Sequence, residues 1–312
     1  MPHAIRFHQT GGPEVLQWEP LPVGAPGPGQ VRLRQTAVGL NFIDTYHRSG
    51  LYPVPLPATP GMEGAGVVAE LGPGVAGFEV GQRVAYAGGP LGAYAEERLI
   101  PSDRLVPLPD DVSDEGAAAM MLQGMTAQYL LRRTFPVKRG DTLLVHAAAG
   151  GVGLILCQWA AALGATVIGT VSTDEKAALA RENGCAHPVV YTREDFVAAV
   201  RELTGGRGVD VVYDSVGRDT FLRSLECLRP LGTMVSFGQS SGAIPPLDVG
   251  LLSQRGSLFL TRPTLMTYTA RREDLLAIAD ELFSVVRAGT VRIPVRQRWP
   301  LRDAAEAHRA LE

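Results

Sequence analysis

The sequence feature that most constrains the fold is a glycine-rich loop between an apolar strand and an apolar helix. Residues 142–147 form the expected strand, and residues 148–153 read Ala-Ala-Gly-Gly-Val-Gly. The expected helix follows at once over 152–163 and stops at Gly164, after which residues 166–171 form a second apolar strand. This order predicts a strand–helix–strand unit, whose two strands are parallel neighbours in one sheet.

The same alternation of strands and helices continues along the chain. Further strands are expected at 189–191, 209–213 and 233–237, and helices at 173–183, 194–203 and 221–228. Ser172 and Glu175 form a capping-box signature for the first of these helices. The pattern predicts a doubly wound parallel sheet with helices on both faces, which is the Rossmann type of α/β fold. A helix at 272–288, a strand at 291–295 and a short helix at 301–311 are expected to follow.

The first third of the chain has a different, turn-rich pattern. Strand-like runs at 31–37, 64–71 and 81–87 are separated by Pro and Gly, and a helical pattern then covers 117–131. These residues predict a compact antiparallel β-domain with a boundary near residue 125. A chain of 312 residues is long enough for two domains.

Composition and charge argue against several classes of protein. The 29 basic and 32 acidic residues give a formal net charge of −3, which argues against nucleic acid as a partner. Cys157, Cys185 and Cys227 form no C-x-x-C pair, so neither a disulfide framework nor a thiolate zinc site is indicated, and a reducing cytoplasm is expected. Residues 143–172 lack Asp, Glu, Lys and Arg, but glycines divide them into strand and helix lengths, which favours a buried sheet over a membrane span.

The position of the glycine-rich loop predicts a phosphate-binding site. The N-terminus of a helix offers unpaired backbone N–H groups and a positive dipole end, provided that no side chain blocks the approach. Gly150 would form the tight turn, Gly151 and Val152 would supply the amides, and Gly153 would allow close packing of the helix on the strand. Within a strand–loop–helix–strand unit, this pattern favours dinucleotide binding over an ordinary turn.

The end of the second strand indicates which dinucleotide is bound. An Asp or Glu there would hold a ribose 2′-hydroxyl and repel a 2′-phosphate, but this strand ends at Ser172 without a carboxylate. Lys176 follows in the first turn of the next helix, where a cation favours the 2′-phosphate of NADPH. Asp174 and Glu175 argue against this choice unless they point outward, and Lys176 as a plain surface lysine is the alternative.

Several motifs in one order resemble a known family. They are residues 39–46 (Gly-Leu-Asn-Phe-Ile-Asp-Thr-Tyr), 61–66 (Gly-Met-Glu-Gly-Ala-Gly), 146–153, 212–217 (Val-Tyr-Asp-Ser-Val-Gly), 236–242 (Ser-Phe-Gly-Gln-Ser-Ser-Gly) and 261–263 (Thr-Arg-Pro). Together they resemble the zinc-free medium-chain dehydrogenase/reductases of the quinone oxidoreductase (zeta-crystallin-like) group. The resemblance covers nearly the whole chain.

The resemblance implies a fold and an assembly. It implies a GroES-like β-rich catalytic domain built from residues 1–125 and 265–312, and a Rossmann NADPH-binding domain over 126–264. An active site in the cleft between these domains is implied, as is a homodimer formed through the Rossmann sheet. Such proteins commonly continue past the final helix into a short segment that contains Arg and Gly, whereas this sequence ends at Glu312.

The resemblance also implies a set of site residues. Those expected to line NADPH are Asn41, Thr126, Gly150, Gly151, Val152, Ser172, Lys176, Tyr191, Val216, Phe237, Gly238 and Ser240. Those expected to face the substrate or to take part in catalysis are Asn41, Tyr46, Tyr52 and Arg262.

The residues at the usual metal positions predict an enzyme without zinc. Asn41 and Met62 stand where the wider superfamily places zinc ligands, and no Cys precedes Cys157. Without a Lewis acid, the acceptor must already be a strong electrophile, such as a quinone, which regains an aromatic ring on reduction. We expect Asn41 and Tyr46 to hydrogen-bond the acceptor oxygen, with a proton from Tyr46, Tyr52 or water; the choice between hydride and single-electron transfer stays open.

Three functions remain as alternatives. The leading hypothesis is an NADPH-dependent quinone reductase in the cytoplasm, with no metal and no membrane partner. The second is an NADPH-dependent reductase of α,β-unsaturated aldehydes or ketones, which would share the fold and the cofactor. The third is a low-turnover NADPH-binding protein with a role in sensing or RNA contact, although the acidic balance argues against RNA. A capping or turn role is expected for Asp214.

Overall fold

The computed structural model describes residues 1–312, and their contacts divide the chain into two compact units. The first unit contains Met1–Met125, Thr269–Asp280 and Ile293–Glu312, and the second contains Thr126–Tyr268 and Glu281–Arg292. The domain bounds predicted from the sequence stay a prediction. None of the helices has the length and the apolar character that crossing a bilayer requires.

A six-stranded parallel sheet forms the centre of the second unit. Its strands are β8 (Thr142–Val145), β9 (Thr166–Val171), β10 (His187–Val190), β11 (Val209–Asp214), β12 (Leu228–Ser236) and β13 (Phe259–Thr261). They lie in the order β10-β9-β8-β11-β12-β13, and every pair is parallel. This order reverses beside β8, as in doubly wound nucleotide-binding sheets, so the predicted Rossmann fold is confirmed.

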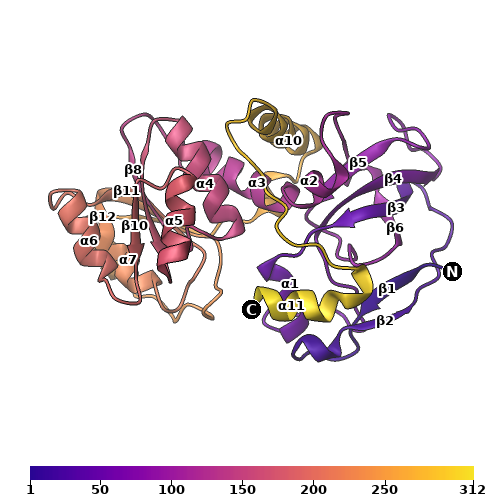
Figure 1. The fold of residues 1–312 in the computed structure, drawn as a ribbon, viewed down its shortest axis with the longest axis horizontal. Coiled ribbons are helices and arrows are strands. Elements are labelled where there is room, and N and C mark those ends of the chain that lie inside the picture. The colour runs from indigo at the N-terminus through magenta and orange to yellow at the C-terminus, as the bar shows by residue number, and fades with distance from the viewer. The chain divides into compact units, whose positions relative to one another are not determined.

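The helices of this unit lie between successive strands, except for the last, which follows β13. They are α4 (Gly151–Ala162), α5 (Asp174–Glu182), α6 (Phe196–Leu203), α7 (Phe221–Cys227), α8 (Gly250–Gln254) and α9 (Leu265–Tyr268). Figure 1 shows α4 and α5 on one side of the sheet and α6 and α7 on the other. Because both faces are covered, the central strand β11 is buried along its whole length, which explains why Val209, Val211, Val212 and Tyr213 all fill it with apolar surface.

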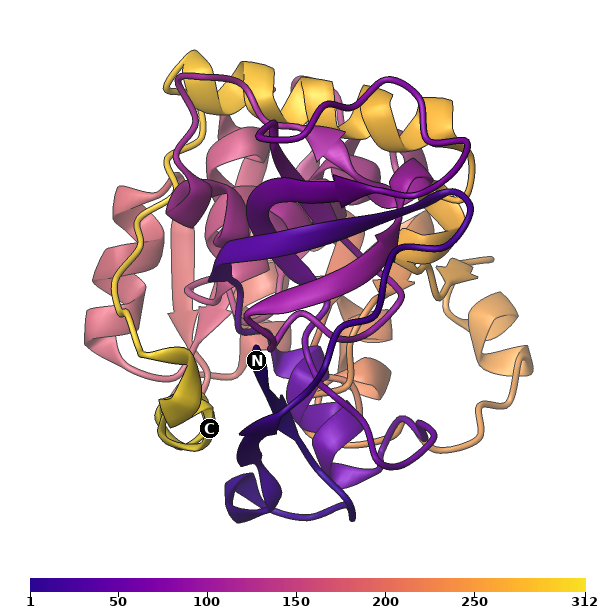
Figure 2. The ribbon, with the colours of Figure 1, turned by 90° about the vertical axis from the view of Figure 1, so that its right-hand side faces the viewer.

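An antiparallel sheet forms the centre of the first unit (Figure 2). Its strands are β3 (Gln30–Val38), β4 (Glu63–Leu71), β5 (Arg83–Ala87), β6 (Glu97–Pro101) and β7 (Val106–Pro107), in the order β6-β3-β4-β5-β7. A separate hairpin pairs β1 (His3–Arg6) with β2 (Gln17–Pro20). The helices of this part are α1 (Phe42–Ser49), α2 (Asp114–Ala118) and α11 (Ala304–Leu311), while α3 (Met121–Tyr129) and α10 (Arg272–Arg287) run across the division between the units.

Three details of the predicted secondary structure were wrong. The helix expected over 117–131 is interrupted between α2 and α3, and it ends in a π-helical turn at Leu130–Thr134. No strand forms over 291–295, where Pro294 lacks the N–H that a ladder needs. The cap of α5 is Thr173 rather than Ser172: the Thr173 hydroxyl accepts the Lys176 N–H at 3.2 Å, so the helix begins one residue later.

Candidate active site

The glycine-rich loop places an uncapped helix N-terminus at the carboxyl end of β8. Gly150 is the N-cap of α4, and no side chain accepts the N–H groups of the first turn. A Cβ on Gly153 would lie 2.2 Å from the Ala147 carbonyl oxygen, so only glycine lets the helix pack this closely on the loop. Ala147 itself has a φ of 52°, which turns the chain sharply after the strand. The loop thus fits the phosphates of a dinucleotide.

A buried polar network centred on His146 lies directly before this loop in the chain and supports it. The His146 ring hydrogen-bonds through Nδ1 to the Thr170 hydroxyl and through Nε2 to the Ser224 hydroxyl, each at 2.8 Å. Burial lowers the pKa of His146, although the nearby Asp214 carboxylate opposes this effect. His146 therefore joins β8, β9 and α7 as a neutral side chain whose two ring nitrogens both have protein partners.

Asp214 organises the turn that follows β11. Its Oδ1 accepts the N–H groups of Val216 and Gly217 at 2.8 and 3.0 Å, and both carboxylate oxygens accept the Thr220 hydroxyl. Ser224 donates a longer hydrogen bond of 3.4 Å to Oδ2. The side chain is fully buried. The expected turn role of Asp214 is confirmed by these contacts.

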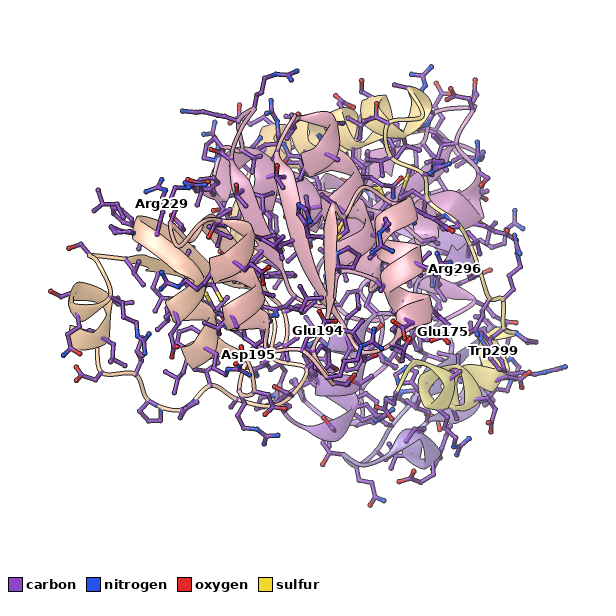
Figure 3. The ribbon with its side chains drawn as sticks, turned by 60° about the vertical axis from the view of Figure 1, so that its left-hand side comes forward. Glu175, Glu194, Asp195, Arg229, Arg296 and Trp299 are labelled. Carbon is purple, nitrogen blue, oxygen red and sulfur yellow. The ribbon has the colours of Figure 1, made fainter.

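The end of β9 brings together the residues predicted to select the dinucleotide. Lys176 is exposed in the first turn of α5, and the Ser172 carbonyl accepts the Thr192 hydroxyl, which ties this turn to the residues after β10. Tyr191 is 53% exposed beside it. Figure 3 shows Glu175 and Glu194 at this same end of the sheet, with Arg229 at the opposite end.

Asp174, two residues before Lys176, is already engaged. Arg193 donates two hydrogen bonds to the Asp174 carboxylate, with N–O distances of 2.7 and 2.5 Å, and the arginine holds the pKa of Asp174 below its usual range. Asp174 therefore repels a 2′-phosphate less than its position in the sequence suggests. Sequence reasoning missed Arg193, because its partner lies 19 residues away.

The loops after β11 and β12 pack against each other. A Cβ on Gly238 would lie 2.6 Å from the Ser215 carbonyl oxygen, and the Phe237 N–H donates to the Asp214 carbonyl at 2.8 Å. Ser240 donates its N–H to the Ser215 carbonyl at 3.1 Å. These contacts hold Val216, Phe237, Gly238 and Ser240 in one loop cluster at the carboxyl edge of the sheet, where doubly wound sheets bind ligands.

Arg262 has partners that the sequence did not reveal. Its guanidinium donates to the Ser236 hydroxyl at 2.9 Å, to the Gly238 carbonyl at 3.0 Å and to the Gln239 side chain at 3.1 Å. The arginine therefore holds the loop after β12 in place. Its predicted part in catalysis stays a prediction.

Asn41 lies at the start of α1 in a buried hydrogen-bonded group of the first unit. Its backbone N–H donates to Asp44 Oδ2 at 2.9 Å, as in a capping box. Its side-chain Nδ2 donates to Glu63 Oε1 at 2.6 Å, and its Oδ1 accepts from Gln123 Nε2 at 3.1 Å. Glu63 and Gln123 are residues whose role the sequence did not indicate, since they lie 22 and 82 residues from Asn41.

The two tyrosines predicted for the substrate side contact each other. The rings of Tyr46, on α1, and Tyr52, after α1, meet edge to face with centroids 5.2 Å apart. The Tyr52 N–H donates to the Tyr46 carbonyl at 3.0 Å, which fixes their spacing. Tyr46 is buried and Tyr52 is half-buried. Their roles in catalysis stay a prediction.

No group of three His, Cys, Asp or Glu side chains in the structure is arranged to hold a metal ion. Met62 is buried directly before Glu63, and all three cysteines are buried and free. Surface hollows occur elsewhere, at residues 77–82 and between His8 and Gln17, and contain none of the predicted site residues.

Comparisons with known proteins agree with this architecture. Residues 27–110 match the alcohol dehydrogenase GroES-like domain, and residues 151–282 match the zinc-binding dehydrogenase family. A quinone oxidoreductase of Pseudomonas aeruginosa is 53% identical over 100% of this chain and 96% of its own length. A 2-haloacrylate reductase of a Burkholderia species is 52% identical over 98% of this chain and 94% of its own length.

Solved structures give the same result. The crystal structure of Escherichia coli quinone oxidoreductase complexed with NADPH matches with a TM-score of 0.97 and 49% identity, over 99% of this chain and 96% of that one. A quinone oxidoreductase of Pseudomonas syringae has a TM-score of 0.98 and 51% identity, over 100% and 96% of the two chains. The chain therefore belongs to the quinone oxidoreductase family of the medium-chain dehydrogenase/reductases.

Proposed function

We propose that this chain is an NADPH-dependent quinone reductase that works without zinc. The observation that carries the proposal is the carboxyl edge of the parallel sheet, where α4 presents uncapped N–H groups and where β9 ends without a carboxylate, one turn before Lys176. A negatively charged dinucleotide with a 2′-phosphate complements both features. Two relatives named quinone oxidoreductase, which are 53% and 50% identical to this chain, support the same function.

The residues of the second unit would hold NADPH in distinct ways. The N–H groups of Gly151 and Val152 would bind the pyrophosphate, while Ser172, Lys176 and Tyr191 would surround the 2′-phosphate and the adenosine. The remaining contacts are assigned to Asn41, Thr126, Gly150, Val216, Phe237, Gly238 and Ser240. When bound, NADPH supplies the reducing equivalents, and the protein contributes orientation and the exclusion of water.

The residues assigned to the acceptor are Asn41, Tyr46, Tyr52 and Arg262. Asn41 and Tyr46 would donate hydrogen bonds to an acceptor oxygen, which stabilises negative charge that develops there during reduction. A quinone suits a site that offers hydrogen-bond donors and no metal ligands, because its reduced product is aromatic. Tyr46, Tyr52 or water would supply the proton.

A second candidate function is the reduction of polarised alkenes. The observation that favours it is the 2-haloacrylate reductase, which is 52% identical to this chain along almost its whole length. Such a substrate also carries an oxygen that can accept a hydrogen bond and that is conjugated to an electron-poor carbon. The same cofactor contacts would serve both reactions.

A spectrophotometric panel tests these functions. Consumption of NADPH and of NADH is followed with ortho-quinones, para-quinones, enones and 2-haloacrylates, with and without a chelator. We expect NADPH oxidation with quinones and no effect of the chelator. Turnover confined to alkenes would select the second function, and tight NADPH binding without oxidation by any acceptor would indicate a binding protein instead.

We expect Lys176→Ala to raise the KM and the Kd for NADPH about 10- to 100-fold, because a charge-assisted contact to the 2′-phosphate is lost. Affinity for NADH should change little. Lys138→Ala is a matched control, since Lys138 and Lys176 are the only lysines of the chain and both are exposed. Equal use of NADPH and NADH by the unaltered protein would contradict the assignment of Ser172 and Lys176.

A homodimer in the cytoplasm completes the proposal. β13 is an edge strand paired only with β12, and Phe259 on it is 60% exposed. An exposed apolar edge of this kind is suited to pairing with a second copy across a two-fold axis. The buried, free cysteines agree with a reducing compartment.

We expect light scattering to give twice the 33.2 kDa mass of the chain, and Phe259→Glu to reduce it to that of the monomer. The reason is that two carboxylates would meet at the paired edges. Leu203→Glu, an exposed position on α6, is the matched control and should leave the mass unchanged. A monomeric unaltered protein, or a dimeric Phe259→Glu variant, would contradict this assembly.

A further inference from the structure

Glu63 is a buried carboxyl group beside Asn41 that the proposed chemistry does not use. It is the first residue of β4 and has no exposed surface. Oε2 accepts the Leu122 N–H at 2.7 Å, and Oε1 lies 2.6 Å from Asn41 Nδ2. A Cβ on Gly39 would lie 2.2 Å from both Oε1 and the Ala118 carbonyl oxygen, so glycine at this position leaves room for the carboxyl group as well as for the backbone of α2. An acid accommodated this specifically next to a predicted ligand contact requires an explanation.

The carboxyl group begins a chain of three side chains, Glu63, Asn41 and Gln123. The amide nitrogen and oxygen of Asn41 have nearly the same shape, so the side chain can present either end to Glu63. With Glu63 ionised, Asn41 Nδ2 donates to Glu63, and Gln123 Nε2 donates to Asn41 Oδ1. With Glu63 protonated, Leu122 still occupies Oε2, so the proton lies on Oε1 and needs an acceptor.

That acceptor is the oxygen end of Asn41, turned toward Glu63. Its nitrogen end then donates to Gln123, whose own carboxamide turns to present oxygen. The 2.6 Å separation is within the range typical of an O–H···O hydrogen bond and shorter than is usual for N–H···O. One proton on Glu63 therefore reverses the polarity of both carboxamides while every heavy atom keeps its place.

We propose that Glu63 is a positioning residue whose carboxyl proton fixes the Asn41 carboxamide with its oxygen toward Glu63 and its nitrogen toward Gln123. In this arrangement the second N–H of the Asn41 carboxamide remains available to donate to the oxygen of a bound quinone, outside the group formed by Glu63, Asn41 and Gln123. Loss of the proton reverses the carboxamide and removes the donor from that position. The inference rests on the proposed function, which places Asn41 at the acceptor oxygen.

The surroundings of Glu63 favour the protonated form. Burial raises the pKa of Glu63 to about 8, and the N–H groups of Asn41 and Leu122 oppose this effect. Asp44 on α1 raises the pKa of Glu63 further when it is ionised, and burial raises the pKa of Asp44 itself to about 7. Other ionisable groups that face Glu63 are Tyr86 on β5 and Tyr94 before β6, and burial raises the pKa of each phenol so that both stay neutral. Arg98 on β6 stacks over the Tyr86 ring, 5.0 Å from its centroid. From α3 come only the Leu122 N–H and Gln123.

The pH dependence of turnover tests the proposal through Glu63→Gln. Glutamine reproduces the protonated acid, since its oxygen accepts the Leu122 N–H and its nitrogen donates to Asn41. In the unaltered protein we expect kcat/KM for a quinone to fall above about pH 8, whereas Glu63→Gln keeps kcat/KM within about threefold at pH 7 and lacks the alkaline fall. Asp44→Asn should retain the alkaline fall in kcat/KM, which would assign that fall to Glu63 rather than to Asp44.

Two results would overturn the proposal. One is an alkaline fall with an unchanged midpoint in Glu63→Gln. The other is a loss of kcat/KM greater than about thirtyfold at pH 7 in Glu63→Gln, with the thermal unfolding temperature and the NADPH affinity retained, since this would show that the carboxylate is the active form.

Infrared spectroscopy tests the same proton without any substrate. Between about pH 6 and pH 9.5, the C=O band of a buried carboxylic acid should disappear from the spectrum of the unaltered protein. The band assigned to Glu63 should be absent from Glu63→Gln and present in Asp44→Asn. If no quinone or alkene is reduced at any pH, the proposed function fails, and the infrared band still decides whether Glu63 carries the proton. Its absence from the unaltered protein at about pH 6 would overturn the inference.

Discussion

Gly153→Ala is expected to lower the affinity for NADPH by at least about a hundredfold, because a displacement of about 1 Å at a binding group can have that effect. The new Cβ would lie 2.2 Å from the Ala147 carbonyl oxygen and 2.9 Å from the backbone of Ala148, and neither is a flexible side chain that could move aside. The first turn of α4 must therefore shift away from the loop. Its N–H groups would then point past the pyrophosphate. Fluorescence titration with NADPH measures the loss.

Two other glycines provide the controls for this experiment. A Cβ on Gly24 would have no heavy atom within 4 Å, so Gly24→Ala should leave both affinity and stability unchanged. A Cβ on Gly150 would lie 3.1 Å from the Ala147 carbonyl oxygen, and Gly150→Ala should produce a smaller loss than Gly153→Ala. If Gly153→Ala binds NADPH as tightly as the unaltered protein does, the loop is not the phosphate site.

Asp214→Leu is expected to lower the free energy of unfolding by about 3–5 kcal/mol. Leucine has the same branched arrangement of side-chain heavy atoms but leaves the buried N–H groups of Val216 and Gly217 without an acceptor, and the Thr220 hydroxyl loses its partner. Each such group costs about 1–3 kcal/mol. Urea denaturation followed by circular dichroism measures the change.

Asparagine separates the structural role of Asp214 from a chemical one. Its oxygen can accept both N–H groups and its nitrogen can donate to the Ser224 hydroxyl, so Asp214→Asn should cost only about 1 kcal/mol and should retain turnover. A variant with unaltered stability and no turnover would instead place Asp214 in the chemistry. That result would contradict the turn role seen in the structure.

Much of the fold could be predicted from the sequence, because its signals are local. The parallel sheet follows from apolar runs of strand length that alternate with helices, and the loop at 148–153 lies directly between such elements. One of the three errors, the interrupted helix over 117–131, arose where a tertiary contact overrides a local signal. The start of α3 is an example: the N–H of Leu122, in its first turn, is accepted by Glu63, 59 residues earlier in the chain.

The candidate site likewise contains residues that the sequence indicated and contacts that only the structure shows. The sequence pointed to Asn41 through its resemblance to a family motif, and to Lys176 through its place in the first turn of an expected helix. It could not identify what each of them contacts. Arg193 engages Asp174 beside Lys176, and Arg262 holds the loop after β12, and neither pairing has a signature in the order of residues.

The amino-acid sequence by itself determined the parallel sheet, the glycine-rich loop and the absence of a carboxylate at Ser172, because each depends on residues that are close together in the chain. Only the tertiary structure decided the partners of the buried polar groups. Asn41, Glu63 and Gln123 meet across 22 and 82 residues, and Arg48 meets His308 across 260. Buried polar groups must find hydrogen-bonding partners, and packing alone determines which distant residues supply them.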